Sequence, residues 1–201
     1  GQRIQSTDAL GGITSYQYDA RGNLIALTDA NGNTHKFTYD RNNRLTKQTL
    51  PAGRSTTYQY DASGNLKQRT DPNGIKTEYR YDAANRLIET KQSKADGTPL
   101  RITTQTWDEA DNPTAWSDTD PTRPTGQQTT TGTATYDEAN RKTSETVTYP
   151  TPDGSTYNLS YSQTHTPAHK KATLTWPDGT KFTYEYTKHG ELFYLRIPGE
   201  G

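Results

Sequence analysis

The sequence has no cysteine and no methionine, and its 23 basic and 23 acidic residues leave no net charge. Without cysteine there is no disulfide framework, no thiolate metal ligand and no cysteine nucleophile. A balanced charge disfavours binding to nucleic acid or a membrane surface, because both depend on a basic face. No run of about 18 apolar residues occurs, so we expect no membrane insertion. The lack of methionine predicts that Gly1 is not a native start and that the chain is a fragment of a larger protein.

Large aliphatic side chains are also scarce, since Leu, Ile and Val, even with Phe added, number only 23. That share lies below the ~20% under which disorder is expected. Disorder of this kind usually accompanies a high net charge, which this chain lacks. Its 14 tyrosines and 3 tryptophans supply large apolar surfaces, and Tyr, Trp and Thr all favour strands. The composition therefore predicts a sheet rich in Tyr and Thr.

A Tyr-Asp pair recurs every 21 residues in the first half of the chain. The four pairs are Tyr18-Asp19, Tyr39-Asp40, Tyr60-Asp61 and Tyr81-Asp82. Four positions after each tyrosine stands a residue that tolerates positive φ, and six positions after it stands leucine. These residues are Gly22, Asn43, Gly64 and Asn85, followed by Leu24, Leu45, Leu66 and Leu87. We therefore assign residues 1–92 to four regular repeats.

Residues 93–201 carry four longer, degenerate copies of the same unit. The position of the repeat tyrosine is held in these copies by Trp107, Tyr136 (followed by Asp137), Tyr161 and Tyr186. The positions four after them, which should adopt positive φ, are Asp111, Asn140, His165 and Gly190. A stretch rich in Pro, Thr and Gln at about 116–132 interrupts the spacing and predicts a long loop.

A second turn follows about half a period after most Tyr-Asp pairs. Its glycines are Gly32, Gly53, Gly74, Gly97, Gly154 and Gly179, and all but Gly53 follow Asn or Asp, the strongest short hairpin signal. Between the turns the apolar residues alternate as in strands. The sequence thus predicts an all-β protein: tandem hairpins of strands about 5–6 residues long, joined in a long, curved antiparallel β-strip. The strip should have exposed edges that allow self-association.

The segments Tyr18-Asp19-Ala20-Arg21-Gly22-Asn23-Leu24 and Tyr60-Asp61-Ala62-Ser63-Gly64-Asn65-Leu66 resemble the Rhs, or YD-repeat, family. The resemblance implies a secreted or envelope protein of a bacterium, whose repeats coil into a shell around a C-terminal toxin or effector. This chain would then be a wall segment, contacting neighbouring repeats of its parent protein. Shells of this family that release cargo carry an aspartyl self-cleavage junction; nothing in the sequence matches it, so no autoproteolytic residue is assigned.

Three groups of polar residues could be taken for sites. His165 and His169 are spaced like metal ligands on a helix, but Pro167 between them disfavours a helix. The segments 29–33 and 71–74 resemble calcium loops, yet their glycine is misplaced for an EF-hand and a hairpin turn explains every residue. The repeated Asp forms a ladder of equivalent carboxylates, whereas an active site needs one constellation of groups. We therefore predict no catalytic, cofactor-binding or metal site, and assign each Asp to bonding backbone N–H groups of its turn.

The tyrosine rows leave two functions open. With few aliphatic residues available, we expect the Tyr rings to form the core of a structural scaffold, with no enzymatic activity. Tyr rows exposed to solvent would instead suit a carbohydrate-binding or cell-surface adhesion module, because an aromatic face can stack on a sugar ring.

Overall fold

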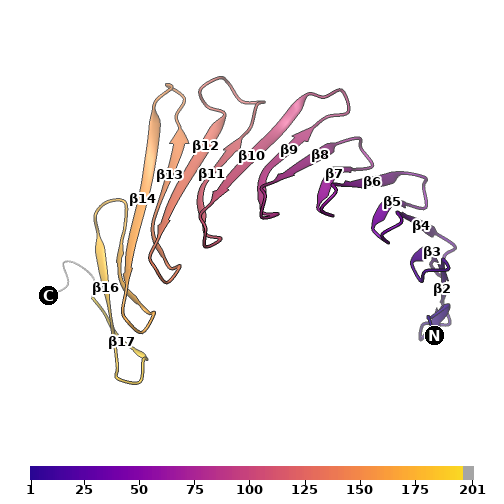
Figure 1. Cartoon of the computed structure of the whole chain (residues 1–201), viewed down its shortest axis with the longest axis horizontal. Helices are drawn as coiled ribbons and strands as arrows, with labels where there is room; N and C mark the ends of the chain where they lie inside the picture. The colour runs from indigo at the N-terminus through magenta and orange to yellow at the C-terminus, as the bar shows by residue number, and fades with distance from the viewer. Residues whose placement is uncertain (197–201) are drawn as a thin grey trace. The chain divides into compact units, whose positions relative to one another are not determined.

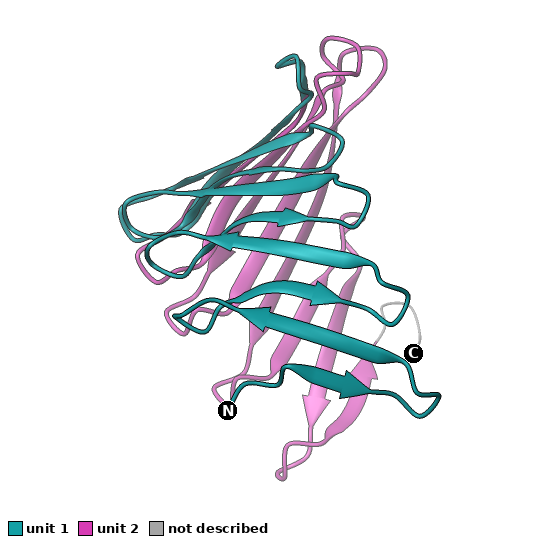
Figure 2. Cartoon of the chain, turned by 90° about the vertical axis from the view of Figure 1, so that its right-hand side faces the viewer, with its two compact units in different colours: residues 1–99 teal, residues 100–201 magenta. Residues whose placement is uncertain are grey.

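The computed structural model describes residues 1–196, which contain 17 strands and no helix (Figure 1). Strands that follow one another in the chain pair antiparallel, both in its first half and in its second half. The all-β prediction is therefore confirmed. The chain divides into two compact units, residues 1–99 and residues 100–201, which Figure 2 colours separately. Residues 197–201, the predicted end of the last repeat, lie outside the described residues.

The first unit is a meander in which each strand pairs with the next. Its strands are β1 (Gln5–Thr7), β2 (Ile13–Tyr18), β3 (Leu24–Thr28), β4 (Thr34–Tyr39), β5 (Leu45–Thr49), β6 (Ser55–Tyr60), β7 (Leu66–Thr70), β8 (Lys76–Tyr81) and β9 (Leu87–Ser93). From β2 to β8 they have five or six residues, the length that the sequence predicts.

The second unit continues the same pattern. Its strands are β10 (Pro99–Trp107), β11 (Pro113–Thr119), β12 (Thr129–Tyr136), β13 (Lys142–Pro150), β14 (Thr156–His165), β15 (Lys171–Thr175), β16 (Lys181–Tyr186) and β17 (Leu192–Arg196). The strands from β10 to β14 are longer, and those from β15 to β17 have five or six residues. The nine residues of β10 and β13 and the ten of β14 exceed the predicted length. Runs of Thr and Ser explain the extension, because they continue the strand pattern where Gly or Asn-Gly would end it.

Two kinds of turn alternate along the chain, as the sequence predicts. The second-turn residues Gly32, Gly53, Gly74, Gly97, Gly154 and Gly179 all adopt positive φ. In the Tyr-Asp turns, positive φ occurs at Gly22, Asn43, Gly64, Asn85, Asp111, Asn140 and Gly190. The register shifts by one residue just before each of these tyrosines, for example between Gln17 and Tyr18, so each Tyr-Asp turn begins with a β-bulge.

The predicted turn position of the seventh repeat is wrong. His165 ends strand β14, and the residue with positive φ is His169, at φ 61°. The turn hydrogen bonds run from the amide of His169 to the carbonyl of Thr166, as they run from Asn140 to Asp137 one repeat earlier. The repeat therefore starts at His165, in the place of tyrosine, and not at Tyr161. The long strand β14 causes the error, because it shifts the turn by four residues from the expected spacing.

The predicted loop at about 116–132 is too long. Strand β11 extends to Thr119 and β12 begins at Thr129, so the connection covers residues 120–128. Thr119 pairs with Thr129, and Trp116 with Gly132, across the two strands. The Thr run 129–131 forms a strand because its branched side chains suit the pleated surface, while the prolines stay in the connection.

The described part of the chain has no closed hydrophobic core, so the prediction that the Tyr rings form one is wrong. Among residues 1–196 no large hydrophobic side chain is buried, and the buried residues are Thr56, Thr77, Ser93, Asn112 and Gly132. Each unit is a single sheet layer, in which neighbours along the sheet cover only part of a ring. Ten of the 14 tyrosines are half-buried and the other four are exposed, so contacts between adjacent strands and adjacent turns carry the stability.

Candidate functional site at the Tyr-Asp turns

The aspartate of each Tyr-Asp pair organises its own turn. One oxygen of Asp19, Oδ1, accepts hydrogen bonds from the backbone amides of Arg21 and Asn23 at 2.9 and 2.8 Å. Asp40 accepts from Asn42 and Arg44 in the same way. The assignment of these carboxylates to backbone N–H groups is thus confirmed.

The second carboxylate oxygen accepts from the side chain five positions after the tyrosine, which we call the link residue. Asn23 donates to Oδ2 of Asp19 at 2.9 Å, and Arg44 donates to Oδ2 of Asp40 through Nε at 2.7 Å. These bonds lower the pKa of both carboxyl groups: the largest cause is the side-chain bond from Asn23 at Asp19 and the backbone bond from Arg44 at Asp40. The acids are therefore held ionised, a state that supports the turn and leaves them no proton to donate at neutral pH.

The tyrosine hydroxyl joins each repeat to the one before it. Tyr39 donates to the carbonyl of Leu24 at 2.9 Å, fifteen residues earlier. The same bond joins Tyr18 to Arg3, Tyr60 to Leu45, Tyr81 to Leu66, Tyr136 to Pro113 and Tyr186 to Lys171. Partial burial raises the pKa of Tyr39, Tyr60 and Tyr81, which keeps the hydroxyl protonated as a donor. This bond was not predicted from the sequence, although a signal is present: Tyr39, Tyr60 and Tyr81 each follow a repeat leucine by fifteen residues.

The link residue also reaches the next turn. We call the residue with positive φ, four positions after the tyrosine, the pivot. Asn23 donates to Oδ1 of the pivot Asn43 at 2.9 Å, and Arg44 lies 4.5 Å from the ring centre of Tyr60. Along each unit the Tyr-Asp turns are thus hydrogen-bonded or stacked on their neighbours at one edge of the sheet.

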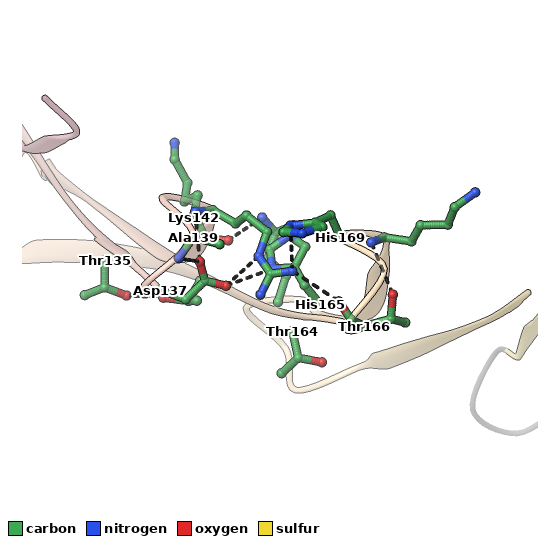
Figure 3. A network of polar contacts seen from close by, with 12 residues as sticks. Thr135, Asp137, Ala139, Lys142, Thr164, His165, Thr166 and His169 are labelled. Carbon is green, nitrogen blue, oxygen red and sulfur yellow. Dashed lines mark hydrogen bonds and ion pairs between the residues drawn. The ribbon is translucent and has the colours of Figure 1, made fainter. Parts of the chain in front are cut away.

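The seventh repeat departs from this arrangement around His165 (Figure 3). The His165 side chain is 10% exposed, and its Nδ1 lies 3.8 Å from Oδ2 of Asp137 without a hydrogen bond. Gln163 donates to the carbonyl of Lys142 at 2.6 Å, the acceptor that a tyrosine at position 165 would use. His169, in the turn, contacts the Arg141 guanidinium through Nδ1 at 3.4 Å. The two histidines therefore have different neighbours, and residues 1–196 contain no cluster of three possible metal-ligating side chains.

The two segments that resemble calcium loops are hairpin turns. Oδ1 of Asp29 accepts from the amides of Asn31 and Asn33, and its Oδ2 accepts from the Asn33 side chain. In the other segment Asp71 accepts from the amides of Asn73 and Ile75. The turn interpretation of the sequence is confirmed at both places.

Exposed aromatic side chains gather in the second unit. Trp176, 48% exposed, lies 6.4 Å from Tyr161 and 5.9 Å from Phe182 between ring centres. Tyr149 and Tyr157 are paired across β13 and β14, and both are exposed. A recess of about 90 Å³ adjoins Tyr161, with Lys142, Glu145 and Gln163 in its lining. Part of the tyrosine face thus stays open to solvent.

Hairpins that are bonded to their neighbours at every turn define a tandem β-hairpin repeat scaffold. The RHS repeat family model matches residues 1–34, 39–74 and 60–99, so these residues are repeats of this family. Comparison with curated protein sequences gives no match. In the part of the chain that the structure describes, no helix has the length and apolar character needed to cross a membrane.

Solved structures share the fold at low sequence identity. The TcdB2-TccC3 protein without its hypervariable C-terminal region matches with a TM-score of 0.67 and 20% identity, over 92% of this chain and 10% of that one. The Tc holotoxin pore of Photorhabdus luminescens matches with a TM-score of 0.63 and 19% identity, over 94% of this chain and 12% of that one. The chain therefore spans about a tenth of the length of these structures.

Proposed function

We propose that this chain is a wall segment of a Rhs-type shell that encloses or presents a C-terminal toxin or effector. The observation that carries the proposal is the hydroxyl bond of each repeat tyrosine to the preceding repeat, as in Tyr60 to Leu45. It ties six of the eight repeats to the hairpin before them, so the structure extends by addition of similar units, as a wall requires. The fold likeness to a protein with a hypervariable C-terminal region supports the same assignment.

The chemistry of the turns agrees with a structural role. The repeated carboxylates accept local hydrogen bonds from their own turns and have equivalent surroundings. A catalytic centre instead brings groups with different pKa values together in one cleft. We therefore propose no enzymatic activity for the chain. By likeness to the toxin proteins, the parent would be secreted or placed in the envelope of a bacterium.

The test is protease digestion of the complete protein that contains this chain, combined with electron microscopy. An enclosing wall predicts hollow particles and a C-terminal region that resists protease until the shell is opened with denaturant. A C-terminal region cut as fast in the intact particle as in denaturant would refute enclosure.

Carbohydrate binding is a second candidate, favoured by the exposed aromatic side chains of β13 to β16. An exposed ring such as Trp176, near a recess lined by Glu145 and Gln163, combines a stacking surface with hydrogen-bonding groups. Screening the chain against a panel of immobilised glycans tests this function. Binding that is lost in Trp176→Ala and kept in Leu192→Ala, an exposed residue of β17, would favour it; binding to no glycan would remove it.

A further inference from the structure

Within each of the two units, most link residues match the pivot of the next repeat in identity. Three asparagine links face asparagine pivots: Asn23 donates to Asn43, Asn65 to Asn85 and Asn112 to Asn140, at 2.8–3.0 Å. In each case the same amide nitrogen also donates to the aspartate of its own turn. An asparagine link therefore uses both amide hydrogens, one within its repeat and one between repeats.

Longer link residues face glycine pivots instead. Gln2, one period before Asn23, donates to the carbonyl of Gly22 at 2.9 Å, and Lys170 donates to that of Gly190. A β-carbon at Gly22 would lie 2.8 Å from Gln2 Nε2, and one at Gly190 equally close to Lys170 Nζ. Arg44 passes beside Gly64 at 3.7 Å from such an atom. Glycine thus leaves room for a long side chain to cross the turn.

One junction uses a third combination. The link Arg141 faces the pivot His169, and its guanidinium donates to the carbonyl of Thr166 at 3.1 Å while contacting the His169 ring. A long cationic link therefore bonds the backbone or ring of the next turn, and it does not depend on a side-chain oxygen at the pivot.

The backbone also differs between the two kinds of pivot. The φ values are 59° at Asn43 and 62° at Asn85, inside the left-handed region that asparagine tolerates, but 89° at Gly22 and 94° at Gly64. The effect of the crossing side chain must therefore be measured between proteins that have the same pivot residues.

We propose that link and pivot residues form a register code, in which an asparagine link selects an asparagine pivot and a long link selects a pivot that need not supply a side-chain acceptor, which is glycine opposite Gln2, Arg44 and Lys170. In the first unit the pivots alternate as Gly22, Asn43, Gly64 and Asn85. If one repeat were skipped during folding, Asn23 would face Gly64 and lose its acceptor. The code thus discriminates against misdocking among repeats whose strands are almost alike.

The test exchanges pivots and links in the full chain. The mismatched variant carries Asn43→Gly and Gly64→Asn, which places glycine opposite Asn23 and asparagine opposite Arg44. The re-matched variant adds Asn23→Arg and Arg44→Asn, which restores a matched partner at both junctions. The two variants have the same pivot residues, so a difference between them comes from the links and not from turn propensity.

Urea unfolding of the three proteins gives the readout. We expect the mismatched variant to unfold with an equilibrium constant about three- to tenfold larger than the parent, because it loses hydrogen bonds between repeats. The re-matched variant should return to within about twofold of the parent. Equal losses in both variants, or no loss in either, would overturn the code. If the mismatched variant does not fold, folding of the re-matched one supports the code and failure of both overturns it. The outcome is independent of whether a shell encloses an effector.

Discussion

The hydroxyl of Tyr39 donates to the carbonyl of Leu24 at 2.9 Å, and this bond crosses from one hairpin to the next. It recurs at five further repeats, which makes it the most regular contact between repeats after the strand ladders themselves. A half-buried ring whose hydroxyl has one defined acceptor explains how a sheet with so few aliphatic residues is ordered. The following predictions rest on this bond and on the turns beside it.

Removal of one hydroxyl should weaken the array measurably. Tyr60→Phe keeps the ring and leaves the carbonyl of Leu45 without its donor. We expect a loss of about 0.5–1.5 kcal/mol in the free energy of unfolding, measured by urea denaturation. Tyr58→Phe in the same strand is the control, since no hydrogen bond of its hydroxyl is found in the described structure. Equal effects of the two changes would contradict the assigned bond.

Acid should destabilise the chain through its turn carboxylates. Their folded-state pKa values are lowered, as at Asp40, where the backbone bond from Arg44 is the largest cause, and at Asp153, where the Thr151 and Ser155 side chains lower the pKa to about 2. A lowered pKa stabilises the fold above the unfolded value of about 3.9, and the contribution is lost as pH falls towards the folded value. Urea midpoints should therefore be level from pH 7 to 5 and fall between pH 4 and 2. A midpoint unchanged at pH 2.5 would contradict this.

Any side chain at position 132 should destabilise the chain. The indole of Trp116 lies against it across β11 and β12, in the space that a β-carbon would fill. Gly132→Ala should cost about 1–3 kcal/mol of unfolding free energy, because the ring must shift. In a Trp116→Ala background the same change should cost much less. A full cost in that background would show that the ring is not the cause.

A tyrosine at position 165 of the seventh repeat should stabilise the chain more than a phenylalanine does. At position 165 a tyrosine would occupy the place of the other repeat tyrosines, within reach of the Lys142 carbonyl that Gln163 now uses. His165→Tyr should unfold at higher urea than His165→Phe, since only the tyrosine can donate to that carbonyl. The difference should be about 0.5–1.5 kcal/mol. Identical midpoints would mean that the two sites are not equivalent.

Much of the fold could be predicted because the turns carry strong local signals. The Asn-Gly and Asp-Gly pairs and the pivots fix where each strand ends, and the 21-residue spacing fixes the order of hairpins. The seventh repeat was placed wrongly at Tyr161, because His165 holds the position of the repeat tyrosine at the end of the long strand β14. The prediction that the Tyr rings form a core was wrong, because composition reveals which rings are apolar but not how many layers cover them.

Contacts between repeats were the part that the sequence did not reveal. The bonds of Tyr39 to Leu24 and of Asn23 to Asn43 join residues 15 and 20 positions apart. Both depend on how one hairpin lies beside the next, which the strand pairing determines. They can be predicted only once the register of β3 and β4 is known.

Deletion of residues 24–65 tests the central claim most directly, because it removes two whole repeats and joins Asn23 to Leu66. The account predicts a shorter array that still folds cooperatively, since each remaining turn meets a matched neighbour, with a smaller denaturant m-value and lower stability. A shortened chain without a cooperative urea transition would contradict the account, because the repeats would then not be equivalent units held by their neighbours.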